Sequence, residues 1–92
     1  MASIQEIQGF QYRIENAVNE YLADKEAGCY ENGAYLAIFY DTDDLPFWDA
    51  AVNEDQSAQD CEFYPIEDYI KDGEPDYDKI SVLANEHIFL DH

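Results

Sequence analysis

The segment from Ala34 to Tyr40 is an uninterrupted run of seven apolar and aromatic residues, and it constrains the fold more than any other part of the chain. A run of this length and composition is typical of a β-strand. The turn Glu31-Asn32-Gly33 precedes it, and Asp41-Thr42-Asp43-Asp44 breaks it before Pro46. We therefore expect this run to form the central strand of a sheet.

A helical pattern precedes that strand. Ser3 and Glu6 fit a capping box at its start, and Gly28 is placed to supply the left-handed residue after its last turn. Apolar residues recur between them at the spacing of one helix face, at Ile4, Ile7, Phe10, Ile14, Val18 and Tyr21. The pattern predicts a helix from about residue 3 to residue 27 that lays this apolar stripe on the sheet.

Three segments after the apolar run have strand character. Phe47 to Val52 is predicted to be the second strand and Cys61 to Tyr64 the third, with a polar turn from Asn53 to Gln59 between them. Pro65 indicates that the next segment, Ile66 to Ile70, is an edge strand or a bent continuation of the third strand.

A second helix is predicted near the end of the sequence. Gly73-Glu74-Pro75-Asp76 has the chemistry of a turn, and Asp76 is available as the N-cap of a helix that carries Tyr77, Ile80, Leu83 and Ala84 toward the core. The segment Ile88 to Leu90 either finishes this helix or returns as a short strand.

These elements together predict one α+β domain spanning residues 1–92, because 92 residues can bury one core but not two. We expect a small antiparallel sheet of three to four strands, with a long N-terminal helix and a shorter C-terminal helix on one face.

Charge is the strongest functional signal in this sequence. The chain has 22 acidic and 4 basic residues, a formal net charge of -18, and residues 41–78 hold fourteen of the acids against Lys71 alone. Its hydrophobic fraction of 47% and aromatic fraction of 15% are higher than a disordered acidic chain carries. We therefore expect a folded domain whose acidic face lies mostly in residues 41–78, and whose self-repulsion needs a compensating use.

The sequence also predicts the location of the protein and two classes of ligand that it does not bind. It has no apolar stretch long enough to span a membrane, and its N-terminus lacks the features of a signal peptide. Cys29 and Cys61 form no C-x-x-C motif and are interpreted as reduced thiols. We expect a cytoplasmic protein that binds neither membranes nor nucleic acid directly, since anionic surfaces would repel it.

Metal and cofactor sites have no recognisable motif. A calcium loop of the EF-hand type starting at Asp41 would need glycine and glutamate where the chain has Pro46 and Val52. Zinc would need several nitrogen or sulfur ligands at characteristic spacing, and the whole supply is Cys29, Cys61, His87 and His92. We therefore predict no metal and no cofactor, although clustered carboxylates could bind hard cations weakly.

Catalytic motifs are equally lacking. A nucleophile pair of Cys29 or Cys61 with His87 has no local signature, and among 22 carboxylates an accidental acid-base pair carries no information. The four glycines are scattered singly and form no phosphate-binding loop. We predict that the protein is not an enzyme.

The aromatic residues divide between core and surface. Core positions are expected for Tyr35, Phe39, Trp48 and Phe63, and exposed contacts for Tyr64, Tyr69 and Tyr77. Exposed rings interleaved with acids would pack on the stems of arginine and lysine side chains of a partner.

The density of charge points to the class of partner. A compact domain of this length is about 30 Å wide, so its excess charges project at about one per 1.7 Å, the axial charge density of duplex DNA. In size and charge the chain resembles the acidic DNA-mimic inhibitors with which phages and mobile elements block restriction enzymes, CRISPR complexes or other DNA-binding proteins. The resemblance implies a stoichiometric inhibitor that occupies the basic groove of a nucleic-acid-binding protein. The predicted partner-binding residues are Asp41, Asp43, Asp44, Asp49, Glu54, Asp55, Asp60, Glu62, Glu67, Asp68, Asp72, Tyr64 and Tyr69.

Two other readings of the acidic surface stay open. The chain could be an interaction or regulatory module for a basic partner unrelated to nucleic acid, or for another copy of itself, with the edge strand and aromatic residues making the contact. It could also carry the acidic surface of a halophile's protein, in which case the charge reflects the solvent. The oligomeric state is not predicted.

Overall fold

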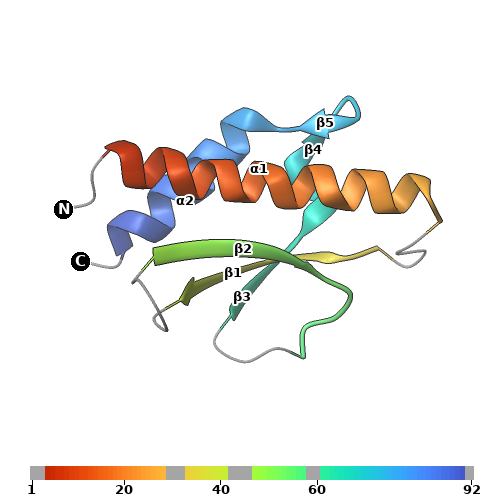
Figure 1. Cartoon of the computed structure of the whole chain (residues 1–92), viewed down its shortest axis with the longest axis horizontal. Coiled ribbons are helices and arrows are strands. Elements are labelled where there is room, and N and C mark those ends of the chain that lie inside the picture. Colours follow the sequence, from red (N-terminus) through yellow and green to blue (C-terminus); the bar gives the residue numbers. More distant parts are fainter. Residues whose placement is uncertain (1–3, 29–32, 42–46, 58–60, 91–92) are drawn as a thin grey trace.

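Two helices cover one face of a small antiparallel sheet (Figure 1). The computed structural model describes residues 4–28, 33–41, 47–57 and 61–90, with the side chains of residues 4–6, 41, 47 and 88–90 excepted. The molecule measures 40 × 28 × 19 Å along its principal axes. The expected α+β class, with a long N-terminal helix and a shorter C-terminal one, is confirmed.

The first helix, α1, runs from Ile4 to Glu26, as the apolar spacing predicts. Its stripe is fully buried from Phe10 through Ile14 and Val18 to Tyr21, because residues three and four apart share one face of a helix. The chain turns away just after the helix at Gly28, whose φ of +93° is the left-handed conformation that glycine adopts without steric cost.

The main sheet has the strand order β2-β1-β3, with both pairs antiparallel. These strands are β1 (Tyr35–Asp41), β2 (Phe47–Asn53) and β3 (Cys61–Pro65). The apolar run is therefore the central strand, as predicted. In the register, Leu36 lies between Val52 and Tyr64, and Ile38 lies between Ala50 and Glu62.

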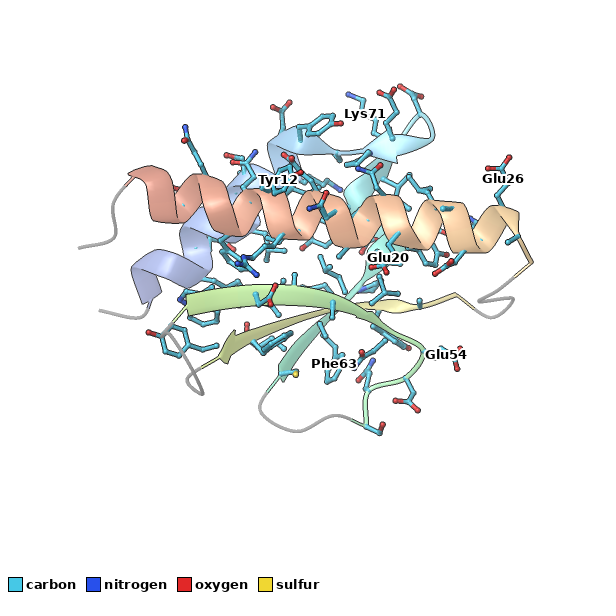
Figure 2. All side chains as sticks on the ribbon, viewed as in Figure 1. Tyr12, Glu20, Glu26, Glu54, Phe63 and Lys71 are labelled. Carbon is cyan, nitrogen blue, oxygen red and sulfur yellow. The ribbon has the colours of Figure 1, made fainter. Side chains whose placement is uncertain are left out.

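The two faces of this sheet differ in what covers them. Leu36 and Ile38 face the helices and belong to the core, while Tyr35, Ala37 and Phe39 alternate onto the other face. Phe63 shares that second face and projects away from α1 in Figure 2. The core prediction is therefore wrong for Tyr35, Phe39 and Phe63, whereas Trp48 packs against the core. The three rings are half-buried on the face that no described helix covers, called the uncovered face below.

The segment expected to be an edge strand is instead a short 3-10 helix, η1 (Ile66–Tyr69). Ile66 is completely buried and its N–H donates to the carbonyl of Ala34 at 3.3 Å. The chain then forms a two-stranded hairpin, β4 (Ile70–Lys71) with β5 (Glu74–Pro75). Asp72 and Gly73 join these strands with φ of 56° and 78°, the two left-handed residues of a type I′ turn.

The second helix, α2, runs from Tyr77 to Leu90 and so includes the segment that could have returned as a strand. Asp76 acts as its N-cap, since the carboxylate accepts a hydrogen bond from the backbone N–H of Lys79 at 3.2 Å. Ile80, Leu83 and Ala84 are buried as expected, but Tyr77 is 51% exposed. Both helices lie on the same face of the main sheet, and the β4–β5 hairpin lies beside α1 (Figure 1).

Candidate functional site

The predicted partner-binding acids fall into three groups. Asp43, Asp44 and Asp60, and the side chain of Asp41, lie outside the described residues. Exposed side chains belong to Glu54, Asp55, Asp68 and Asp72. The remaining three predicted acids, Asp49, Glu62 and Glu67, make contacts within the fold that are described next.

Two of these acids tie the first helix to the rest of the chain. Asp49 on β2 forms an ion pair with Arg13 of α1 at 3.3 Å. Glu67 of η1 accepts hydrogen bonds from the hydroxyl of buried Tyr21 and from Lys25, both at 2.6 Å. The bonds from Lys25 and Tyr21 lower the pKa of Glu67, and burial with the Glu67 bond raises the pKa of Tyr21 to about 12. Two of the four basic residues are thus used to neutralise acids of the protein itself.

The third acid, Glu62, belongs to a compact polar cluster with Tyr64 and His87. The Tyr64 hydroxyl donates to Glu62 Oε2 at 2.9 Å and lies 2.9 Å from Nε2 of His87, which is itself 3.1 Å from the same carboxylate oxygen. The tautomer that carries its proton on Nε2 satisfies this arrangement, because it donates toward both oxygens. Burial, with the bond to Glu62, raises the pKa of Tyr64 above its usual value.

Aromatic rings enclose His87 on several sides. Its ring centroid lies 5.2 Å from Trp48, 5.8 Å from Tyr64 and 6.3 Å from Phe10, and the residue is only 4% exposed. This burial lowers the pKa of His87, while the charges of Glu62 and Glu86 oppose the shift. His87 is therefore a buried, hydrogen-bonded core residue whose pKa lies below that of an exposed imidazole.

The sulfur–histidine pair considered from the sequence is not assembled by Cys61. Cys61 pairs with Phe39 in the register and shares the uncovered face of the sheet, whereas His87 packs on the helix-covered face. Cys29 lies outside the described residues. Within the described part of the chain, histidine, cysteine, aspartate and glutamate form no group of three or more that could hold a metal ion.

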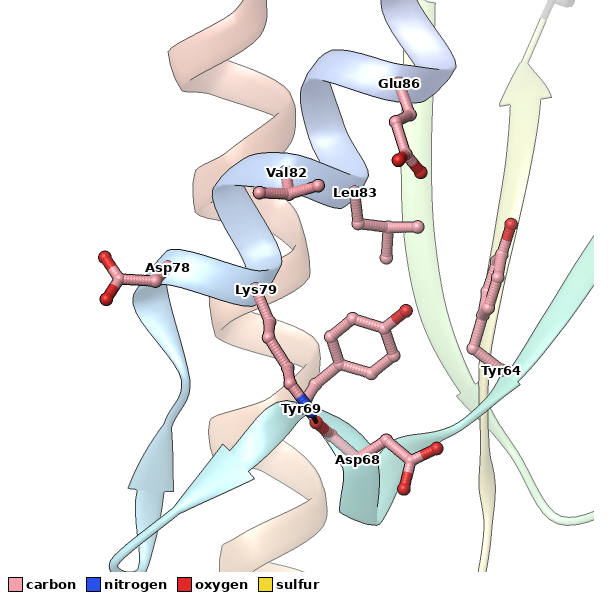
Figure 3. A pocket seen from close by; sticks show the side chains of 8 residues that line it. All are labelled: Tyr64, Asp68, Tyr69, Asp78, Lys79, Val82, Leu83 and Glu86. Carbon is pink, nitrogen blue, oxygen red and sulfur yellow. Dashed lines mark hydrogen bonds between the residues drawn. The ribbon is translucent and has the colours of Figure 1, made fainter.

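A groove of about 410 Å³ lies between α2 and the η1 segment (Figure 3). Its apolar surface comes from Val82, Leu83 and the rings of Tyr64 and Tyr69, which meet edge to face with centroids 6.1 Å apart. Three carboxylates and one ammonium complete the lining, from Asp68, Asp78, Glu86 and Lys79. Val82 is 58% exposed, so the groove presents an apolar side chain to solvent on an otherwise acidic surface.

The electrostatic field in this groove is negative. Burial and the charges of Asp68 and Glu86 raise the pKa of Tyr69, and Glu86 acts in the same direction on Tyr64. Lys79 reaches across the groove and donates to the backbone carbonyl of Asp68 at 3.2 Å (Figure 3). The site therefore already holds one ammonium group and keeps an excess of negative charge beside apolar surface.

The structure brings together only part of the predicted site. Tyr64, Tyr69 and Asp68 meet in this groove, but the two tyrosines are half-buried, where the sequence predicted exposed rings. The contributions of Asp78, Val82 and Glu86 were missed. Their signal was a spacing of four residues, which places all three on one face of a helix, separate from the face of Ile80 and Leu83.

Neither helix in the described part of the chain is both long and apolar enough to cross a membrane. Comparisons of this chain with protein-family models, with curated proteins and with solved structures gave no match.

Proposed function

We propose that the protein is a non-catalytic acidic binding protein that occupies the basic groove of a DNA- or RNA-binding protein and so inhibits it, as anti-restriction and anti-CRISPR inhibitors do. The observation that carries the proposal is the density of uncompensated charge. A net charge of -18 is spread over a molecule 40 Å long. Duplex DNA of that length carries roughly 24 phosphate charges, at about one per 1.7 Å of axis.

The few basic residues cannot offset this charge. Arg13 and Lys25 pair with Asp49 and Glu67, and Lys79 donates to a backbone carbonyl, so these contacts serve the fold. A lysine- and arginine-lined groove is the natural complement of the remaining carboxylates. Binding there would release the counterions held by the groove, as the binding of nucleic-acid phosphates does. The opposite charges would also attract the two proteins to each other over long range.

A second candidate function rests on the uncovered face of the main sheet. Tyr35, Phe39 and Phe63 lie half-buried there around the buried Ala37. The register places Asp41 and Asp49 on the same face, and Asp49 is paired with Arg13. An apolar face of this kind favours an interaction module for a basic or neutral protein unrelated to nucleic acid.

Competition with DNA separates the two functions. Tagged protein is incubated with host lysate at about 50 mM and about 200 mM salt, where phosphate-like contacts weaken by orders of magnitude. Each captured protein is then purified and tested for displacement by duplex DNA. A nucleic-acid-binding protein that DNA displaces, and that is lost at the higher salt, supports mimicry. A partner that DNA does not displace supports the interaction module.

A matched variant tests whether the carboxylates drive the capture. The surface variant combines Glu20→Gln, Glu54→Gln, Asp72→Asn and Glu74→Gln. All four positions are exposed, and the changes together reduce the net negative charge from -18 to -14. Under mimicry the affinity falls and its salt dependence becomes shallower, because fewer charges replace phosphates. Unchanged affinity and unchanged salt dependence would contradict mimicry through these acids.

A further inference from the structure

We infer that the groove between α2 and η1 binds an arginine side chain from a basic, amphipathic segment of the protein partner. This assignment rests on the proposed function, because it identifies the part of the acidic surface that makes a specific contact. Three features of the groove carry it: its apolar surface, its paired tyrosine rings and its flanking carboxylates.

The apolar surface selects against a bare inorganic cation. Val82 is 58% exposed and stands beside Leu83 on the wall that α2 contributes. An arginine or lysine side chain packs its methylene stem on such a surface while its charged head stays in a polar environment. A simple metal ion or a phosphate-bound counterion gains nothing from Val82.

The tyrosine pair favours a guanidinium over an ammonium group. Tyr64 and Tyr69 stand at 84° to each other, so that the edge of one ring meets the face of the other. A planar guanidinium stacks on aromatic faces and donates in two directions to carboxylates, whereas an ammonium acts as a point charge. The carboxylates among the lining residues are those of Asp68, Asp78 and Glu86, of which Asp78 points away from the two rings (Figure 3).

The protein's own Lys79 shows that this groove accommodates a cation. Its ammonium lies against the backbone carbonyl of Asp68, and the groove volume of about 410 Å³ remains beside it. The three carboxylates among the lining residues outnumber the single ammonium group, that of Lys79, by three to one. Charge complementarity therefore calls for at least one further cation, supplied by the partner.

The test uses the whole protein and a defined probe, a fluorescent helical peptide that carries arginine and leucine on one face. The groove variant is Asp68→Asn with Glu86→Gln, and the matched control is Glu20→Gln with Glu54→Gln, which changes the charge equally at exposed positions elsewhere. We expect the groove variant to bind the peptide about tenfold more weakly and the control to change affinity less than about threefold.

Two further arms test the apolar contact and the guanidinium. Val82→Ser, a change at an exposed position, is expected to weaken binding of the arginine–leucine peptide more than that of an oligoarginine peptide of equal charge, which loses only the packing of an arginine stem. A peptide with lysine in place of arginine is expected to bind more weakly to the wild-type protein. Amide shifts in an NMR titration should concentrate on Tyr69 and on the face of α2 that carries Val82 and Glu86.

Each contrary result has a defined meaning. Equal losses in the groove and control variants would overturn the groove as a specific site while leaving an acidic binding protein in place. Equal binding of the lysine and arginine peptides would overturn the assignment of a guanidinium. Loss of partner capture by the surface variant, together with no peptide binding at all, would leave the proposed function standing and reject this groove.

Discussion

At the scale of single residues, His87 couples the packing of the core to pH. Its imidazole is buried among Trp48, Phe10 and Tyr64, and this burial lowers its pKa below the ordinary value of about 6.5. The unfolded chain therefore binds more protons than the folded chain once the pH falls below about 6.5. His87 contributes its full stability above that pH, and the contribution is lost as the pH falls toward the folded-state pKa.

We predict that His87→Gln flattens this part of the stability profile. Urea unfolding at pH 7.5 and pH 5.5 should show the wild-type protein losing more stability than the variant, by at most about 1.4 kcal/mol for each pH unit below 6.5. Glu62 and Glu86 face the imidazole and reduce the difference. An NMR titration of the ring protons gives an independent measure, and a midpoint for His87 at or above 6.5 would contradict the prediction.

The candidate site shows what single residues in a sequence can reveal. Asp49, Glu62 and Glu67 were predicted to bind a partner because they are acidic, yet each is engaged by another part of the fold. Their contacts join residues far apart in the chain, such as Tyr21 and Glu67, and composition carries no information about such pairs. Tyr64, Tyr69 and Asp68 were singled out from the sequence and do lie together in one groove, but the groove itself depends on how α2 packs.

At the scale of elements, the N-cap of α2 offers a clean test of local stability. The Asp76 carboxylate accepts from the N–H of Lys79, and the Asp76 N–H donates to the Tyr69 carbonyl at 2.8 Å. We predict that Asp76→Ala lowers the free energy of unfolding by about 1 kcal/mol through loss of the cap. Asp76→Asn removes the same charge but keeps a capping oxygen, so it should remain close to wild type in chemical denaturation. Equal effects of the two changes would assign the loss to charge.

Elements with a clear period were predictable, and elements shaped by tertiary contacts were not. The stripe of α1 follows the helical period along the helix, and β1 is a continuous apolar run of strand length. The segment 66–75 has no such pattern, because tertiary contacts fix its shape. Ile66 is buried in the core, and its N–H donates to the Ala34 carbonyl. Its apolar residues Ile66, Tyr69 and Ile70 have helical spacing, and the Asp-Gly pair at 72–73 is a hairpin signal that the turn at 73–76 obscured.

At the scale of the whole molecule, the carboxylates that make the surface acidic also repel one another. Charges interact over about 30 Å at 0.01 M salt and over about 10 Å at 0.1 M. The molecule measures 40 × 28 × 19 Å, so at low salt most of its carboxylates repel one another. A halophilic protein would depend on salt to fold, whereas a protein that uses its charge for binding has to fold without it.

We predict that the protein is folded at about 0.01 M salt and that its melting temperature rises on going to about 0.1 M salt. Relief of about 1 kcal/mol of repulsion would raise the midpoint by roughly 4–8 °C for a domain of this size. Repulsion scales with the product of the charges, so the surface variant at -14 should show roughly 60% of the wild-type rise. Circular dichroism melts of both proteins measure this. An unfolded wild-type chain at the lower salt would favour the halophilic reading, and identical rises in both proteins would show that the salt acts through something other than net charge.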